Sequence, residues 1–165
     1  MNQLYAEAGV KKKEDMQSII IKALLAAAVF VSLFVATLGS YFILISVAVI
    51  AGVFFLFPRL NVEYEYVFVD GQIDFDRIMG KAKRKTLLRI DMEQVEIVAQ
   101  IGSHALDSYN NAQYVTKNFS SGDKSAKPFV IIASAEDKKY RILFEPSEKM
   151  ITMMRQKSPR KISMI

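Results

Sequence analysis

The only histidine of the chain, His104, is the side chain best suited to proton transfer near neutral pH. It lies in the polar segment Gly102-Ser103-His104. A catalytic histidine needs a nucleophile or an orienting carboxylate that the fold brings beside it. We expect instead a solvent-facing loop residue. The sequence contains no cysteine, which excludes thiolate nucleophiles and cysteine-based zinc sites.

Four carboxylates fall on two neighbouring segments, with Glu63 and Glu65 on the first and Asp74 and Asp76 on the second. Oxygen ligands of this kind can hold a hard cation, and together with His104 they could serve a hydrolase or transferase. Acidic residues are also ordinary on exposed strand faces, so we predict no metal site and no cofactor. The sequence has no phosphate-binding glycine loop, HExxH motif or nucleophile elbow. We therefore predict no catalytic residues and no enzyme activity, with the hydrolase or transferase as a minority alternative.

A basic cluster occupies a glycine-initiated turn further along the chain. It could engage anionic lipid headgroups or a protein partner, or it could be a solvated turn. The net charge of +5 is too mild for a nucleic-acid binder, which would show a denser basic patch with stacking aromatics. The cluster consists of Lys81, Lys83, Arg84 and Lys85.

No charged residue lies between Lys22 and Arg59. A bilayer core accommodates about 20 helical residues, so this block is too long for one straight span. Gly39 and Ser40 offer a break, which predicts a transmembrane hairpin over residues 16–58 with spans at 19–38 and 40–57. A cleaved signal peptide is the competing interpretation, but its apolar region would be shorter.

Positive charges flank the hairpin and are absent from its connection. Lysines 11–13 and 22 precede it, Arg59 follows it, and residues 1–15 form a polar leader. The positive-inside rule then predicts a multi-pass protein of the plasma membrane with both termini cytoplasmic. Small residues recurring four apart predict close helix packing, with homo-oligomerisation as the alternative. These residues are Ala28, Ser32, Ala36, Ala48 and Gly52.

From residue 59 to 165 the pattern changes to that of strands and turns. Alternation predicts a hairpin of Val62–Val69 with Gln72–Met79 around an Asp-Gly turn, followed by strands at 86–90 and 95–101. Residues 102–127 are expected to form a long loop or irregular insertion. A second hairpin, 129–134 with 139–144, precedes a helix over 146–158 whose methionine stripe should cover the core of the domain.

This order of strands and C-terminal helix resembles the pleckstrin-homology-like fold. Three segments follow the charge-free block: Glu63-Tyr64-Glu65-Tyr66, Val69-Asp70-Gly71 and Lys81-Ala82-Lys83-Arg84-Lys85. In these segments the whole chain also resembles a family of uncharacterised small bacterial membrane proteins with a two-span hairpin and a C-terminal pleckstrin-homology-like domain. The resemblance implies an α+β membrane protein with an antiparallel β domain. It carries over no activity, cofactor or catalytic residue.

We therefore expect a membrane-anchored, non-enzymatic interaction or regulatory module that presents a small β domain at the cytoplasmic membrane face. A protein partner would contact the basic turn or residues 103–127. An accessory subunit of a larger membrane transporter or enzyme is the alternative. The expected partners are the lipid bilayer, anionic headgroups, another protein and a second copy of the chain, but not nucleic acid.

Overall fold

The computed structural model describes residues 4–80, 83–110, 113–123, 125–135 and 137–163. Its elements divide into two compact units. One comprises Lys13–Val62 with Met79–Lys83 and is mainly helical, and the other comprises the remaining segments and is mainly strands. The helices are α1 (Met16–Ala36), α2 (Ser40–Leu56) and α3 (Glu148–Lys157), and the strands are β1 (Tyr5–Lys11), β2 (Val62–Val69), β3 (Gln72–Met79), β4 (Lys83–Asp91), β5 (Val95–Gln100), β6 (Val115–Asn118), β7 (Phe129–Ala135) and β8 (Lys138–Phe144).

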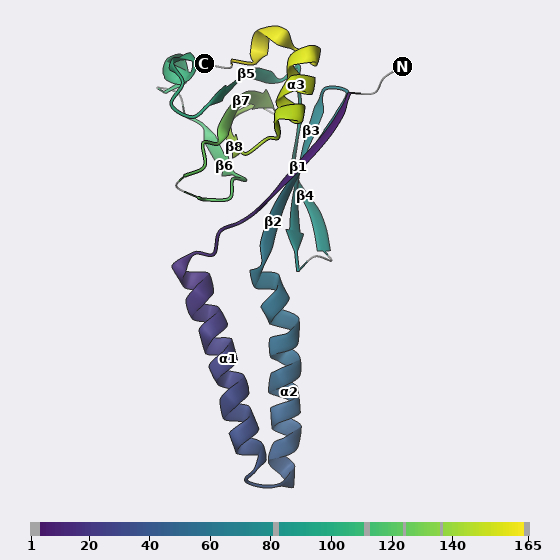
Figure 1. Ribbon diagram of the computed structural model, residues 1–165, viewed down its shortest axis with the longest axis vertical. Helices are drawn as coiled ribbons and strands as arrows, with labels where there is room; N and C mark the ends of the chain where they lie inside the picture. The colour runs from purple at the N-terminus through teal and green to yellow at the C-terminus, as the bar shows by residue number, and fades with distance from the viewer. Residues whose placement is uncertain (1–3, 81–82, 111–112, 124, 136, 164–165) are drawn as a thin grey trace. The chain divides into compact units, whose positions relative to one another are not determined.

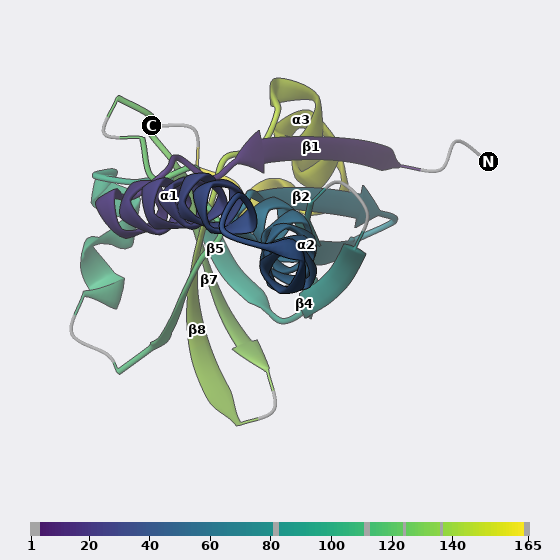
Figure 2. The same ribbon diagram turned by 90° about the horizontal axis from the view of Figure 1, so that it is seen from below.

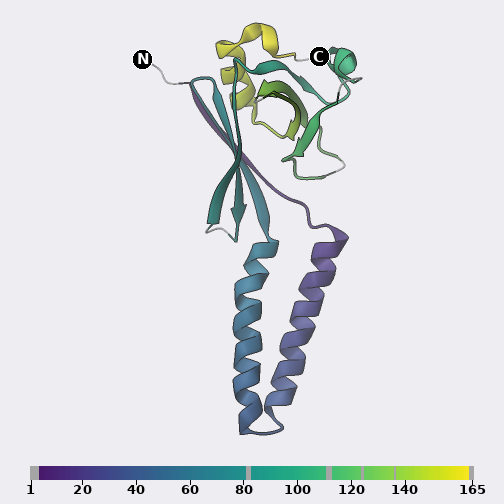
Figure 3. The same ribbon diagram turned by 180° about the vertical axis from the view of Figure 1, so that it is seen from behind.

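Helices α1 and α2 form an antiparallel pair that is closest at the connection between them and diverges toward the start of α1 and the end of α2 (Figures 1 and 3). The Asp15 side chain accepts a hydrogen bond from the backbone N–H of Ser18 and so caps the start of α1. Each helical stretch, Met16–Ala36 and Ser40–Leu60, has 21 residues and is long and apolar enough to cross a membrane. Only 6% of each apolar stretch is buried, unlike the core helix of a globular domain. The predicted helix pair is confirmed.

The first sheet has the order β1-β2-β3-β4. The hairpin of β2 and β3 has the predicted boundaries, but the first strand of the sheet was not predicted. Strand β1 lies within residues 1–15, interpreted above as a leader, and pairs antiparallel with β2 from Tyr5 opposite Val69 to Lys11 opposite Glu63. Small apolar residues at every second position of β1, beginning with the fully buried Ala6, allow this fit. The β domain therefore includes residues that precede the helix pair as well as residues that follow it.

The second sheet has the order β5-β7-β8-β6 and is mixed, because β6 pairs parallel with β8 while the other pairs are antiparallel. The segment 102–127 is more ordered than expected. It contains the 3-10 helix η2 (His104–Tyr109) and strand β6, and it buries Leu106 and Phe119. These two apolar side chains fix the segment to the domain.

The main core of the β domain lies between the two sheets and under α3. Aromatic rings of Tyr66, Phe75, Phe119 and Phe144 meet at its centre with centroid separations of 4.9–5.8 Å. Helix α3 covers the core and contacts β1, and Figures 1 and 2 show the two side by side. Its buried methionines confirm the covering role predicted for the helix. They are Met150 and Met154.

Candidate functional site

The end of α2 brings two distant segments of the chain together. Helix α2 continues into the 3-10 turn η1 (Phe57–Leu60), where Pro58 occupies an early position that needs no backbone donor. The Lys22 ammonium donates to Asn61 Oδ1 at 2.8 Å and pairs with the Glu14 carboxylate. The backbone N–H of Gly80 donates to the carbonyl oxygen of Asn61 at 3.2 Å. The start of α1, the end of α2 and the end of β3 are therefore joined at Asn61.

The close approach of β3 to η1 requires a glycine. Gly80 has φ of +60°, and a Cβ at this position would lie 2.8 Å from Cβ of Pro58. Any larger residue would combine an unfavourable left-handed backbone with a steric clash.

A pocket of about 530 Å³ lies beside this contact. Its apolar walls come from the last turn of α2 and from the end of β3, and two cationic side chains, Arg59 and Lys83, also line it. Both cations are exposed, and neither makes an ion pair with any residue that the structure describes. The pocket therefore combines apolar surface with two available positive charges. Its apolar and small lining residues are Phe54, Phe55, Pro58, Met79 and Gly80.

The predicted basic cluster divides into residues with different surroundings. Lys81 lies outside the described residues, Lys83 lines the pocket, and Lys85 is exposed. The Arg84 guanidinium instead pairs with the Glu65 carboxylate and lies 3.5 Å from Asp76 Oδ2. Arg84 is thus neutralised within the domain, so the four residues do not form one free basic surface.

Three of the four predicted acidic strand residues, Glu65, Asp74 and Asp76, pair with arginines, and Glu63 lies opposite Lys11 in the β1–β2 ladder. Asp74 accepts two hydrogen bonds of 2.7 Å from Arg89, and this contact holds the pKa of the Asp74 carboxyl below its usual value. Asp76 is buried and faces Arg84. Among the described residues, no three or more His, Cys, Asp or Glu side chains are grouped closely enough to hold a metal ion.

His104 opens the 3-10 helix η2 and is fully exposed. Its Nδ1 lies 3.2 Å from Asp107 Oδ2, three residues further along the same helical turn. This contact is local to the surface of η2.

The two long helices contact each other through a face that overlaps only partly with the predicted small-residue stripe. Ser32 is buried, Ala36 is half-buried, and Ala28 lines a groove between the helices. Ala48 is exposed, and a Cβ on Gly52 would meet no atom within 4 Å, so neither marks a close approach.

Sequence reasoning missed Ser46, which is almost fully buried between the helices. Its hydroxyl lies 2.5 Å from the carbonyl oxygen of Ser32 and 3.0 Å from that of Phe42. A serine within an otherwise apolar helix was the available signal, because its hydroxyl needs an acceptor in an apolar environment.

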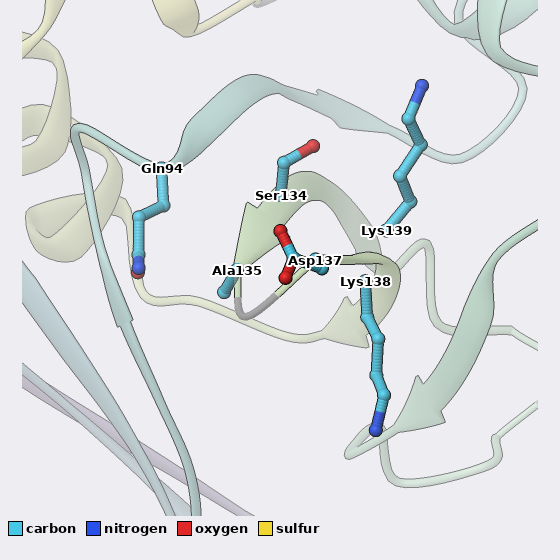
Figure 4. A pocket seen from close by; sticks show the side chains of 6 residues that line it. All are labelled: Gln94, Ser134, Ala135, Asp137, Lys138 and Lys139. Atoms are coloured by element: carbon cyan, nitrogen blue, oxygen red, sulfur yellow. The ribbon is translucent and has the colours of Figure 1, made fainter.

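A second, more polar pocket of about 410 Å³ lies at the β7–β8 hairpin. Figure 4 shows the side chains of Lys138 and Lys139 extending in opposite directions, with the Asp137 carboxylate at the turn. The Ser134 hydroxyl is already engaged, since it donates to Glu96 Oε1 at 2.8 Å. The two lysine ammonium groups do not point toward a common position, so the pocket does not form an anion-binding site.

Two four-stranded sheets closed by a C-terminal helix, with a pair of long apolar helices between β1 and β2, define a PH-like domain with an inserted helical hairpin. The chain belongs to the family described as Bacterial PH-like domain (DUF6106), whose model matches residues 2–164. The function of this family is not established. No curated protein and no solved structure matches the chain.

Proposed function

We propose that this protein is a membrane-anchored, non-enzymatic interaction module that presents its PH-like domain at the cytoplasmic face of the plasma membrane. Helices α1 and α2 are its anchor, and a protein partner binds the β domain. The two helices are long, apolar and largely unburied, which supports a lipid environment for them.

The observation that carries this proposal is the pairing of β1 with β2. Strand β1 ends only a few residues before α1, and β2 begins shortly after α2, yet Lys11 lies opposite Glu63 in the ladder. A chain that leaves the sheet at one strand and returns at its neighbour must cross a membrane an even number of times. Two crossings therefore place both termini on one side.

The charges favour the cytoplasm as that side. Lys12 and Lys22 precede or begin the first crossing and Arg59 follows the second, while the connection Thr37-Leu38-Gly39 carries no charge. Lysine and arginine are enriched in short cytoplasmic segments beside membrane spans.

The absence of cysteine allows a clean test of topology. Single cysteines would be introduced as Leu38→Cys in the connection and Ser125→Cys in the β domain, both at exposed positions. A membrane-impermeant maleimide should label the Leu38→Cys variant in intact bacterial cells, and the Ser125→Cys variant only after permeabilisation. Labelling of Ser125→Cys in intact cells would refute the cytoplasmic placement.

A second candidate is an accessory subunit that packs through its helices against a larger membrane protein. A groove of about 460 Å³ along the helix pair, lined by residues such as Ala27, Ala28 and Val31, favours it. Crosslinking in native membranes followed by mass spectrometry distinguishes the two. A partner crosslinked through the β domain supports the first function, and one crosslinked through α1 or α2 supports the second.

A further inference from the structure

We infer that the pocket at the end of α2 binds the phosphate headgroup of an anionic phospholipid, through Arg59 and Lys83. This inference rests on the proposed membrane anchoring, and it adds a specific ligand to it. Its lining residues include none of those at the β7–β8 hairpin pocket and neither of the paired arginines, Arg84 and Arg89.

The first argument is the depth of the pocket along α2. Phe54 and Phe55 belong to the last helical turn, and Pro58 and Arg59 follow directly in η1. In a membrane-spanning α2, the change from phenylalanine to arginine marks the change from hydrocarbon to headgroups. The pocket therefore lies at the depth of lipid phosphates.

The second argument is that Arg59 and Lys83, unlike the arginines nearby in the sequence, have no carboxylate partner among the described residues. Of the cations near the β3–β4 turn, Arg84 is neutralised by Glu65 and Asp76, and Arg89 by Asp74. Lys83 lines the pocket together with Arg59, and the described residues supply neither with a carboxylate partner. An anion from outside the protein can pair with both cations. A phosphodiester suits this role because it has two unesterified oxygens, one for each cation.

The third argument is the apolar wall. Phe54 and Phe55 are 75% and 69% exposed, and they lie beside the cations. A soluble phosphate would pair with the cations but has no group that contacts these rings, whereas a phospholipid also places its acyl chains against them. The volume of about 530 Å³ falls within the range of ordinary small-ligand pockets.

The pocket is also held open by a rigid frame. The hydrogen bonds from Lys22 and Gly80 to Asn61 fix η1 and the end of β3, and Gly80 packs directly on Pro58. Arg59 thus extends from a fixed backbone, which lowers the entropy cost of binding.

The test uses the full-length protein in detergent micelles and native mass spectrometry with dioleoyl phosphatidylglycerol or dioleoyl phosphatidylcholine. The unmodified protein should retain phosphatidylglycerol preferentially. The double variant Arg59→Gln, Lys83→Gln should lose this preference by about thirtyfold, since each cation near a membrane surface raises the affinity for anionic lipid about fivefold. The matched control is Lys12→Gln, Lys85→Gln, which removes the same charge at exposed positions outside the pocket, and it should retain the preference.

Three outcomes would overturn the inference. They are equal binding of the two lipids by the unmodified protein, equal loss in both double variants, and competition by glycerol 1-phosphate as effective as that by phosphatidylglycerol. The last outcome would identify a soluble phosphate site instead. Retention in membranes after alkaline carbonate extraction is measured in parallel. A protein that stays integral but shows no lipid preference refutes only this inference, whereas a protein released by carbonate refutes the proposed function.

Discussion

The Tyr66 hydroxyl joins three separate segments of the β domain, and its removal should be costly. The side chain is fully buried, and its O–H donates to the carbonyl oxygen of Phe119 at 2.5 Å. The same oxygen accepts the backbone N–H of Glu145 at 3.4 Å. Tyr66→Phe preserves the ring packing but leaves these buried backbone groups without that partner.

The expected loss of unfolding free energy is about 2 kcal/mol, from the range of about 1–3 kcal/mol for a buried group left unsatisfied. For a domain of this size that corresponds to a decrease in melting temperature of about 10 °C. Differential scanning calorimetry of the full-length protein in micelles measures it. Tyr41→Phe is the matched control, because Tyr41 is 87% exposed and its change should cost less than about 0.5 kcal/mol. If both variants have the same melting temperature as the unmodified protein, the reasoning is wrong.

The pH dependence provides a second check on the same residue. Burial, above all, raises the pKa of the Tyr66 phenol above its ordinary value of 10.0, so the folded state favours the neutral form. The stability that Tyr66 contributes is fully present below pH 10 and is lost as the pH rises beyond it. The difference in stability between the unmodified protein and Tyr66→Phe should therefore narrow above pH 10, and a constant difference would contradict the assignment.

Two further substitutions test local features. Gly80→Ala should destabilise the protein by about 1–3 kcal/mol, because it adds a left-handed alanine and a contact with Pro58. Gly52→Ala, whose Cβ would meet open space, should cause no loss, and equal melting temperatures for the two variants would refute the close approach. Asp74→Asn should lower stability at neutral pH by removing the pairing with Arg89, which lowers the pKa of Asp74. That contribution is present above pH 3.8 and is lost as the pH falls below it. The free energies of unfolding of the unmodified protein and of Asp74→Asn, measured with urea, should therefore become equal in acid.

The elements with local signals could be predicted from the sequence. The β2–β3 hairpin has strict alternation and an Asp-Gly turn, and the structure gives both strands the predicted boundaries. Asp70 and Gly71 both adopt positive φ at that turn, as such a pair permits. The helix break before Ser40 was equally clear, since a long uncharged block must bend to fit a bilayer.

The elements that depend on distant partners could not be predicted. Strand β1 contains two alanines and a glycine, which have weak strand propensity. It is stabilised by β2, which follows α1 and α2 in the sequence. Strand β6 is exposed throughout and so has no alternation to detect. For the candidate site, the basic cluster could be predicted from the sequence. Which of its cations are free could not, because Arg84 is neutralised by carboxylates that folding brings close, whereas Lys83 lines the pocket.

The pairing of β1 with β2 also orders the biosynthesis of the protein. Strand β1 leaves the ribosome first, but its partner is translated only after α1 and α2. On the proposed topology, the first sheet can be completed only when both helices have been inserted and the chain has returned to the cytoplasm. A chain that inserts one helix alone leaves β1 and β2 on opposite sides of the bilayer, with β2 exposed and unpaired along one edge. Completion of the first sheet therefore depends on correct insertion of both helices.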